Sequence, residues 1–146
     1  MTPLFALIPC PVALAIAALF TRNTRFLTRF AAWSMAAQLA AALWFWASRL
    51  QSHGAPSDRE VAAGFCVDSM AAFFVLLTTL VVTCALIHAV GFFAREAEGP
   101  HPPPARHVAQ FYVFAPLFLL AMYSVVTAYN LGYLWIGMEA TTLAVA

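Results

Sequence analysis

Glu139 is the residue whose type and position most directly indicate chemistry. It stands in an apolar run from Leu131 to Leu143 that carries no other charged side chain. A helix that starts after Asn130 rises about 1.5 Å per residue, which would carry this carboxyl roughly 13 Å into a bilayer. A charge costs about 2.5–3.5 kcal/mol at that depth, whereas a leucine or isoleucine returns only about 0.3–0.6 kcal/mol. An acid kept there is normally turned into a helix bundle, where it is protonated, paired or hydrated.

Two roles fit such an acid. Apolar surroundings favour a neutral carboxylic acid, and an approaching ammonium or guanidinium group favours the carboxylate, so a mobile cation would load and unload a proton. The alternative is a neutral acid that only bonds a neighbouring helix. We expect the proton site. The chain has no lysine, and its arginines fall at or near the ends of apolar stretches, so the cation would come from elsewhere.

Three further polar residues are candidates for proton translocation. Thr142 lies one turn beyond Glu139, where its hydroxyl would bond the carboxyl or hold a water, and Trp135, one turn before, would wall the site. Asp68 precedes an apolar stretch, a position that also suits a helix N-cap. His88 lies about 20 residues further on, near the opposite interface, and is either a proton relay or an ordinary interfacial histidine.

The composition places these residues in a membrane. Of 146 residues, 64% are hydrophobic and 9% are charged, against roughly 45–50% and 25% in soluble domains. So few charges exclude a soluble enzyme domain and a disordered linker. A net charge of +1 without lysine leaves no basic surface for nucleic acid. The chain is therefore expected to be an integral membrane protein in contact with the lipid bilayer.

Five apolar stretches predict the transmembrane helices, at about 3–20, 26–50, 69–93, 108–129 and 131–146. None shows the period-two alternation of a membrane strand. The predicted fold is all-α, a polytopic membrane helix bundle of four complete transmembrane helices plus a truncated fifth, in a single domain covering 1–146. Because the fifth stretch is still apolar at Ala146, we expect the sequence to be the N-terminal part of a longer protein.

The arginines predict the orientation. Arg22 and Arg25 occupy the short loop after the first stretch, and Arg29 opens the second. The positive-inside rule places this loop in the cytoplasm and the N-terminus outside. We expect the inner (cell) membrane of a prokaryote.

No metal or cofactor site is predicted. Cys10, Cys66 and Cys84 are too widely spaced for a disulfide framework or a metal site, so buried apolar thiols are expected. His101 and His107 do not have metal-ligand spacing.

The stretch around Glu139 resembles a known family. The residues Asn130-Leu131, Leu134-Trp135 and Glu139-Ala140-Thr141-Thr142-Leu143 are similar to the fifth-helix signature of the antiporter-like proton-pumping subunits of respiratory complex I (NADH:quinone oxidoreductase) and membrane-bound hydrogenases. The last five resemble most closely the component F family of hydrogenase-4 and formate hydrogenlyase-type complexes. Upstream resemblance lies in Val67-Asp68-Ser69-Met70, in Ile87 to Phe93 and in Phe111-Tyr112. Two departures are Ser69, where the family commonly has proline, and His88, where it usually has tyrosine.

The resemblance implies that Glu139 is the proton-channel glutamate, paired in the family with lysines of later helices. It implies a membrane subunit of a proton-translocating redox complex, without redox chemistry or cofactor of its own, whose partners are other membrane and peripheral subunits of a respiratory or hydrogenase complex. Two alternatives stay open: a subunit of a multi-subunit cation/proton antiporter, and a structural membrane bundle. The electron donor and acceptor, the type of complex and the ion specificity do not follow from these residues.

Overall fold

The computed structural model describes residues 3–21, 23–51, 64–99 and 103–145. Within these ranges the regular structure is helical, apart from an isolated antiparallel bridge between Phe65 and Ala128. The elements are a 3-10 helix, η1 (Pro3–Leu7), and the α-helices α1 (Pro9–Phe20), α2 (Thr24–Gln51), α4 (Ser69–Ala97), α5 (Ala105–Thr127) and α6 (Leu131–Val145).

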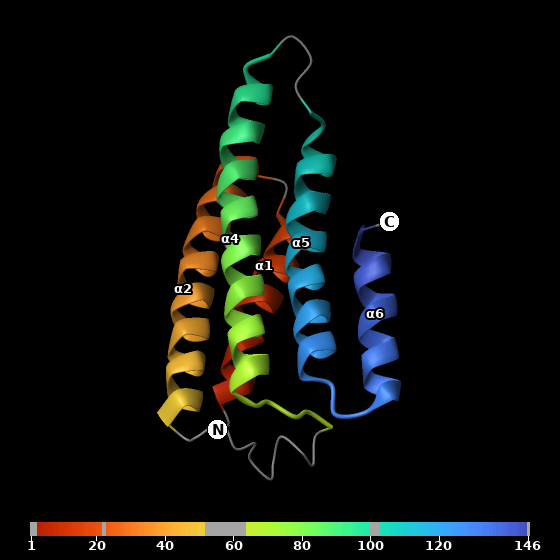
Figure 1. The fold of residues 1–146 in the computed structure, drawn as a ribbon. Coiled ribbons are helices and arrows are strands. Elements are labelled where there is room, and N and C mark those ends of the chain that lie inside the picture. Colours follow the sequence, from red (N-terminus) through yellow and green to blue (C-terminus); the bar gives the residue numbers. More distant parts are fainter. Residues whose placement is uncertain (1–2, 22, 52–63, 100–102, 146) are drawn as a thin grey trace.

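Four of the described helices form a bundle, and α6 stands beside it. α1 packs on α2 and α5, and α4 packs on the same two helices, which closes a ring. Successive helices run in opposite directions, and α6 lies outside the ring (Figure 1). Among the described helices, α6 contacts α5 alone. One side of α6 is therefore packed and the other is uncovered.

Three helices begin at a side chain that caps them. Asn23, Asp68 and Asn130 each accept a hydrogen bond from the backbone N–H three residues further on, at 3.3, 2.7 and 3.0 Å respectively. The N–H groups of a first helical turn have no acceptor inside the helix, so a side-chain oxygen at this point stabilises the start. These short polar residues set where α2, α4 and α6 begin.

Three of the predicted spans are confirmed as helices of membrane length. They cover Phe26–Gln51, Ser69–Ala97 and Ala105–Thr127. At about 1.5 Å per residue, each is longer than the roughly 30 Å of hydrocarbon in a bilayer. The second of them starts at the predicted residue and continues past Phe93, because the residues up to Ala97 also favour a helix.

The first predicted span, 3–20, is helical but shorter than a membrane-spanning helix. Ile8 separates η1 from α1, which has only 12 residues. Pro9 explains the division, because proline has no N–H with which to extend the hydrogen-bond ladder. With α6 at 15 residues, the described chain has three helices of membrane length, and the four complete spans predicted from the sequence are not confirmed.

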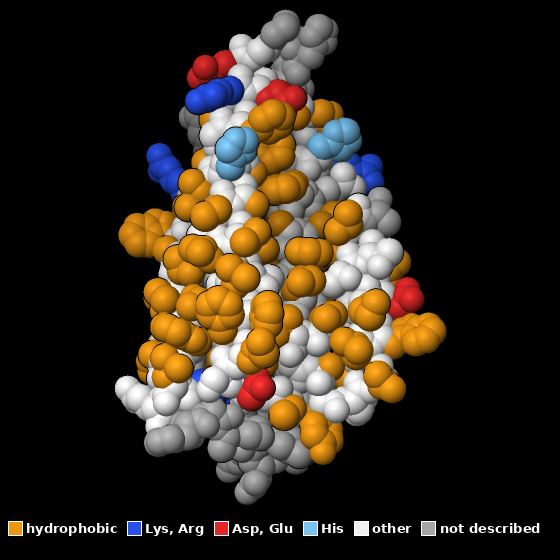
Figure 2. Space-filling view, in the orientation of Figure 1, with side chains coloured by type: hydrophobic (Ala, Val, Ile, Leu, Met, Phe, Trp, Pro, Cys, Tyr) orange, Lys and Arg blue, Asp and Glu red, His pale blue; other side chains and the backbone are white. Residues whose placement is uncertain are grey.

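The surface suits a lipid environment. Hydrophobic side chains cover the long face of the molecule in Figure 2, and most charged and histidine side chains on that face gather toward its upper end. Large exposed apolar residues include Phe20, Trp33 and Ile87. Such surface is unfavourable in water and favourable against lipid, which supports an integral membrane protein.

A short pairing ties the residues before α4 to the turn between α5 and α6. Cys66 N–H donates to the Thr127 carbonyl at 2.9 Å, and Tyr129 N–H donates to the Gly64 carbonyl at 3.0 Å. The Phe65 ring lies 6.1 Å from the ring of Tyr133. We call these residues, 64–66 with 127–129 and Tyr133, the loop clamp.

Gly64 is required in the loop clamp. Its φ of +83° is one that other residues rarely adopt, and a Cβ there would lie 2.5 Å from Cε2 of Tyr133. Glycine alone satisfies both conditions. The clamp therefore allows the first turn of α6 to approach the backbone that leads into α4.

Candidate functional site

Glu139 lies on the uncovered side of α6. Gly137 is buried against α5, where an added Cβ would lie 2.8 Å from Cγ2 of Val125 and 3.0 Å from Oγ of Ser124. Two residues further along a helix is about 200° around its axis. Glu139 therefore points away from α5, and its side chain is exposed.

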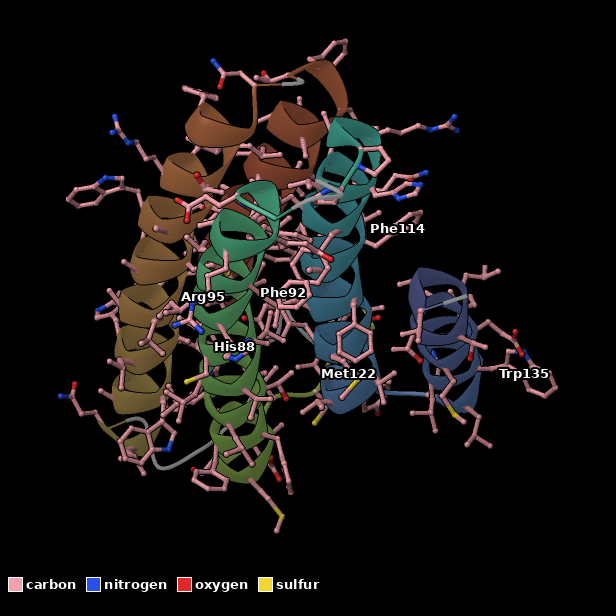
Figure 3. The ribbon with its side chains drawn as sticks, turned by 90° about the horizontal axis from the view of Figure 1, so that it is seen from above. His88, Phe92, Arg95, Phe114, Met122 and Trp135 are labelled. Carbon is pink, nitrogen blue, oxygen red and sulfur yellow. The ribbon has the colours of Figure 1, made fainter. Side chains whose placement is uncertain are left out.

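A shallow hollow of about 420 Å³ lies around this carboxyl. Glu139, Trp135 and Met138 line it together with two leucines of the same helix, Leu131 and Leu134. Trp135 is 70% exposed and projects away from the bundle in Figure 3. The indole borders the hollow as expected, so α6 supplies one apolar wall around an acid.

No cation of the described chain lies close to Glu139. Among the described helices, α5 alone contacts α6, and the arginine of α5, Arg106, lies about 25 Å along the helix from Tyr123. Arg49, near the end of α2, is buried with its guanidinium carbon 5.4 Å from the centre of the Phe45 ring. Within the described residues, no hydrogen bond or ion pair forms at the Glu139 carboxylate.

Thr142 does not form a hydrogen bond with Glu139. Its hydroxyl donates to the Met138 carbonyl of its own helix at 3.0 Å, and the Thr141 hydroxyl donates to the same carbonyl at 2.7 Å. Thr142 borders a different hollow, beside Phe118 of α5. The expected hydrogen bond to the Glu139 carboxyl is absent because the Thr142 hydroxyl donates its hydrogen to the Met138 carbonyl.

Asp68 is the N-cap of α4. Its carboxylate accepts the Ala71 N–H at 2.7 Å, which confirms the structural interpretation of this residue. α4 and α6 do not contact one another, so Asp68 and Glu139 do not belong to one site.

His88 lies on the outer face of α4. Its side chain is exposed and shares that face with Phe92 and Arg95, at helical spacing (Figure 3). It is therefore turned to the surroundings of the bundle and away from its interior. The four proton candidates are not assembled: Asp68 and His88 lie on α4, which does not contact α6, and Thr142 forms no hydrogen bond with Glu139.

A buried polar network, not foreseen from the sequence, joins four elements. The Gln38 side-chain amide of α2 donates to the Leu7 carbonyl of η1 at 3.0 Å and to the Tyr123 hydroxyl of α5 at 2.9 Å. The same hydroxyl lies 2.6 Å from Oγ1 of Thr79 on α4. Gln38 and Thr79 are fully buried. A lone glutamine at the centre of an apolar stretch is the signal that marks this network.

Several buried polar atoms have no hydrogen-bond partner among the described residues. They are Oε1 of Gln38, the Thr83 hydroxyl and the Tyr112 hydroxyl. Leaving such a group unpaired costs about 1–3 kcal/mol. The bundle interior is thus more polar than its sequence pattern suggests.

No group of three or more potential metal ligands comes together in the described residues. The cysteines are free, but they are not buried as expected: Cys10 and Cys66 are half-buried, and Cys84 is exposed on α4. The expectation failed because Cys84 lies on the face that α4 turns outward.

Comparison with known proteins found no matching family model, no matching curated protein and no matching solved structure. The function must therefore be argued from the residues themselves.

Proposed function

We propose that this chain is a membrane subunit of a proton-translocating redox complex, of the hydrogenase or NADH:quinone oxidoreductase type, in which Glu139 carries the proton. The observation behind this proposal is the place of Glu139: a carboxyl on the uncovered face of an apolar helix, beside Trp135 and Met138. An ionisable side chain in hydrocarbon is costly, and such residues are found mainly where they have a function.

The uncovered face needs a partner. Facing lipid, the carboxyl would have no hydrogen-bonding group near it, which costs several kcal/mol for a buried polar group. A helix from outside residues 1–146, carrying a lysine or arginine at the same depth, would cover the hollow and provide the cation. Its approach would favour the carboxylate and release the proton, and its withdrawal would favour the neutral acid and bind a proton.

The N-terminus faces outward in this proposal. The exposed arginines Arg29, Arg95 and Arg106 lie near the end at which α2 begins and α4 ends, whereas Arg49 at the other end is buried. Basic residues favour the cytoplasmic side. The arginine-rich end is therefore cytoplasmic, in a prokaryotic inner membrane.

Electron transfer in partner subunits would drive the cycle, and this chain would bind no flavin, iron–sulfur cluster or quinone. A cation/proton antiporter subunit would use the same acid but would respond to an ion gradient. Proton transport that needs sodium and no electron donor would favour the antiporter.

Replacement of Glu139 tests the proposal. The full-length protein in its assembled complex is reconstituted into vesicles, and proton uptake is followed with a pH-sensitive dye during turnover. Glu139→Gln, which keeps the shape but holds no exchangeable charge, abolishes uptake, and Glu139→Asp retains part of it.

Glu96→Gln is the matched control, because Glu96 lies in the exposed last turn of α4. It leaves uptake unchanged. Wild-type uptake in Glu139→Gln would contradict the proposal and favour a structural bundle.

A further inference from the structure

Tyr123 connects the bundle core to the helix that carries Glu139. Its hydroxyl contacts side chains of two other helices, Gln38 of α2 and Thr79 of α4. The next two residues of α5, Ser124 and Val125, are those that lie closest to Gly137 of α6. Tyr123 thus belongs to the buried network and directly precedes the residues of α5 that contact α6.

The directions of these hydrogen bonds follow from the number of hydrogens available. The Thr79 hydroxyl donates its one hydrogen to the Val75 carbonyl at 2.6 Å, so the Tyr123 O–H donates to Oγ1 of Thr79. The Gln38 amide donates to the Tyr123 oxygen. The hydroxyl is thus held as a donor by one helix and as an acceptor by another, which fixes the rotation of α5 about its axis.

The contact between α5 and α6 transmits that rotation directly. Gly137 has no side chain, and the backbone N of Val125 would lie only 3.1 Å from a Cβ added there. Small residues allow such close helix approach, and the atoms of α5 nearest to this point belong to the short side chains of Val125 and Ser124 and to the Val125 backbone. A turn of α5 therefore moves α6 and Glu139 with it.

Little else in the described chain holds Glu139 in place. The loop clamp fixes the first turn of α6 through Tyr133, and Glu139 lies about 9 Å further along the helix. The α5 side chains that border α6 carry no titratable group: Phe114, Leu117, Phe118, Leu120, Ala121 and Ser124. α5 can therefore act on the carboxyl only by setting its position.

We propose that Tyr123 is a positioning residue for Glu139: its hydrogen bonds to Gln38 and Thr79 set the orientation of α5, and α5 sets the direction in which the carboxyl faces. This inference rests on the proposed function for its effect on transport. Its structural half can be measured without transport.

Tyr123→Phe tests the inference, with Tyr112→Phe as the matched control. Both tyrosines are buried in α5, but the Tyr112 hydroxyl has no hydrogen-bond partner among the described residues. Spin labels report the distance between α4 and α6 in the full-length protein within its complex. They are attached at Leu80→Cys and Ile136→Cys, with Cys10, Cys66 and Cys84 replaced by alanine.

Tyr123→Phe shifts or broadens this distance, lowers proton uptake by about tenfold and moves the pH of half-maximal uptake. Tyr112→Phe changes none of the three. Thr79→Val removes the acceptor while keeping the tyrosine and gives the same result as Tyr123→Phe, which covers the case in which Tyr123→Phe does not fold.

A wild-type distance and pH profile in Tyr123→Phe and Thr79→Val, with uptake abolished in Glu139→Gln, overturns the inference and leaves the proposed function standing. Uptake that survives Glu139→Gln overturns the proposed function instead. In that case the measured distance alone decides whether Tyr123 sets the position of α6.

Discussion

Substitutions of Asp68 distinguish two properties of its carboxylate, which are accepting a hydrogen bond and carrying a proton. Asp68→Ala removes the acceptor of the Ala71 N–H and is expected to destabilise the protein by about 1 kcal/mol. Asp68→Asn keeps a capping oxygen and is expected to remain within a few tenths of a kcal/mol of wild type. Thermal unfolding in detergent measures both. If Asp68 only caps α4, Asp68→Asn also leaves proton uptake unchanged, and a loss of uptake would assign it a proton.

A second prediction for a single side chain concerns Thr142. Its hydroxyl donates to the Met138 carbonyl, so Thr142→Val is expected to leave the rate and pH profile of proton uptake unchanged. Vesicle uptake assays measure both quantities. A marked loss would mean that the hydroxyl turns to the carboxyl during turnover.

Single residues could be predicted from the sequence only where their role is local. Asp68 could be assigned as a cap because a cap involves residues three positions apart. Gln38 could not be paired with Tyr123, because the two are 85 positions apart and their contact depends on how α2 and α5 are rotated and aligned. The direction of Glu139 depends in the same way on which side of α6 meets α5.

Among the described helices, α6 packs on α5 alone, so the stability of its packing depends on the contact between Gly137 and α5. Gly137→Ala places a methyl group within 2.8 Å of Val125, and we expect a loss of about 1–3 kcal/mol in the stability of the α5–α6 packing. Gly91→Ala is the matched control, since nothing lies within 4 Å of its added Cβ. Alanine favours a helix over glycine by up to about 1 kcal/mol, so this variant is expected to be as stable as wild type or more so. Unfolding in mixed detergent distinguishes them, and equal stability of the two variants would refute close packing at Gly137.

The lengths of the elements were predicted well where hydropathy alone decides them. α2, α4 and α5 are long and apolar, and their predicted spans match helices of membrane length. The span predicted at 3–20 is not confirmed, because a count of apolar residues does not register the break at Pro9.

For the molecule as a whole, the orientation in the membrane is the property to test. Glu96→Cys, at the arginine-rich end, and Tyr129→Cys, at the other end, are both exposed positions. In a background without the native cysteines, a membrane-impermeant maleimide is expected to label Glu96→Cys only in inverted vesicles and Tyr129→Cys only in intact spheroplasts. The reverse pattern would place the N-terminus in the cytoplasm.

The loop clamp determines how α6 is able to move. Because Gly64 and Phe65 hold Tyr133 at the first turn, α6 cannot slide along α5 as a rigid rod, and the movement left to it is a tilt about a pivot at that end. Displacement in a tilt grows in proportion to distance from the pivot. Val145, about 18 Å beyond Tyr133, would travel twice as far as Glu139 at about 9 Å, so a given displacement at Val145 brings only half that displacement at the acid.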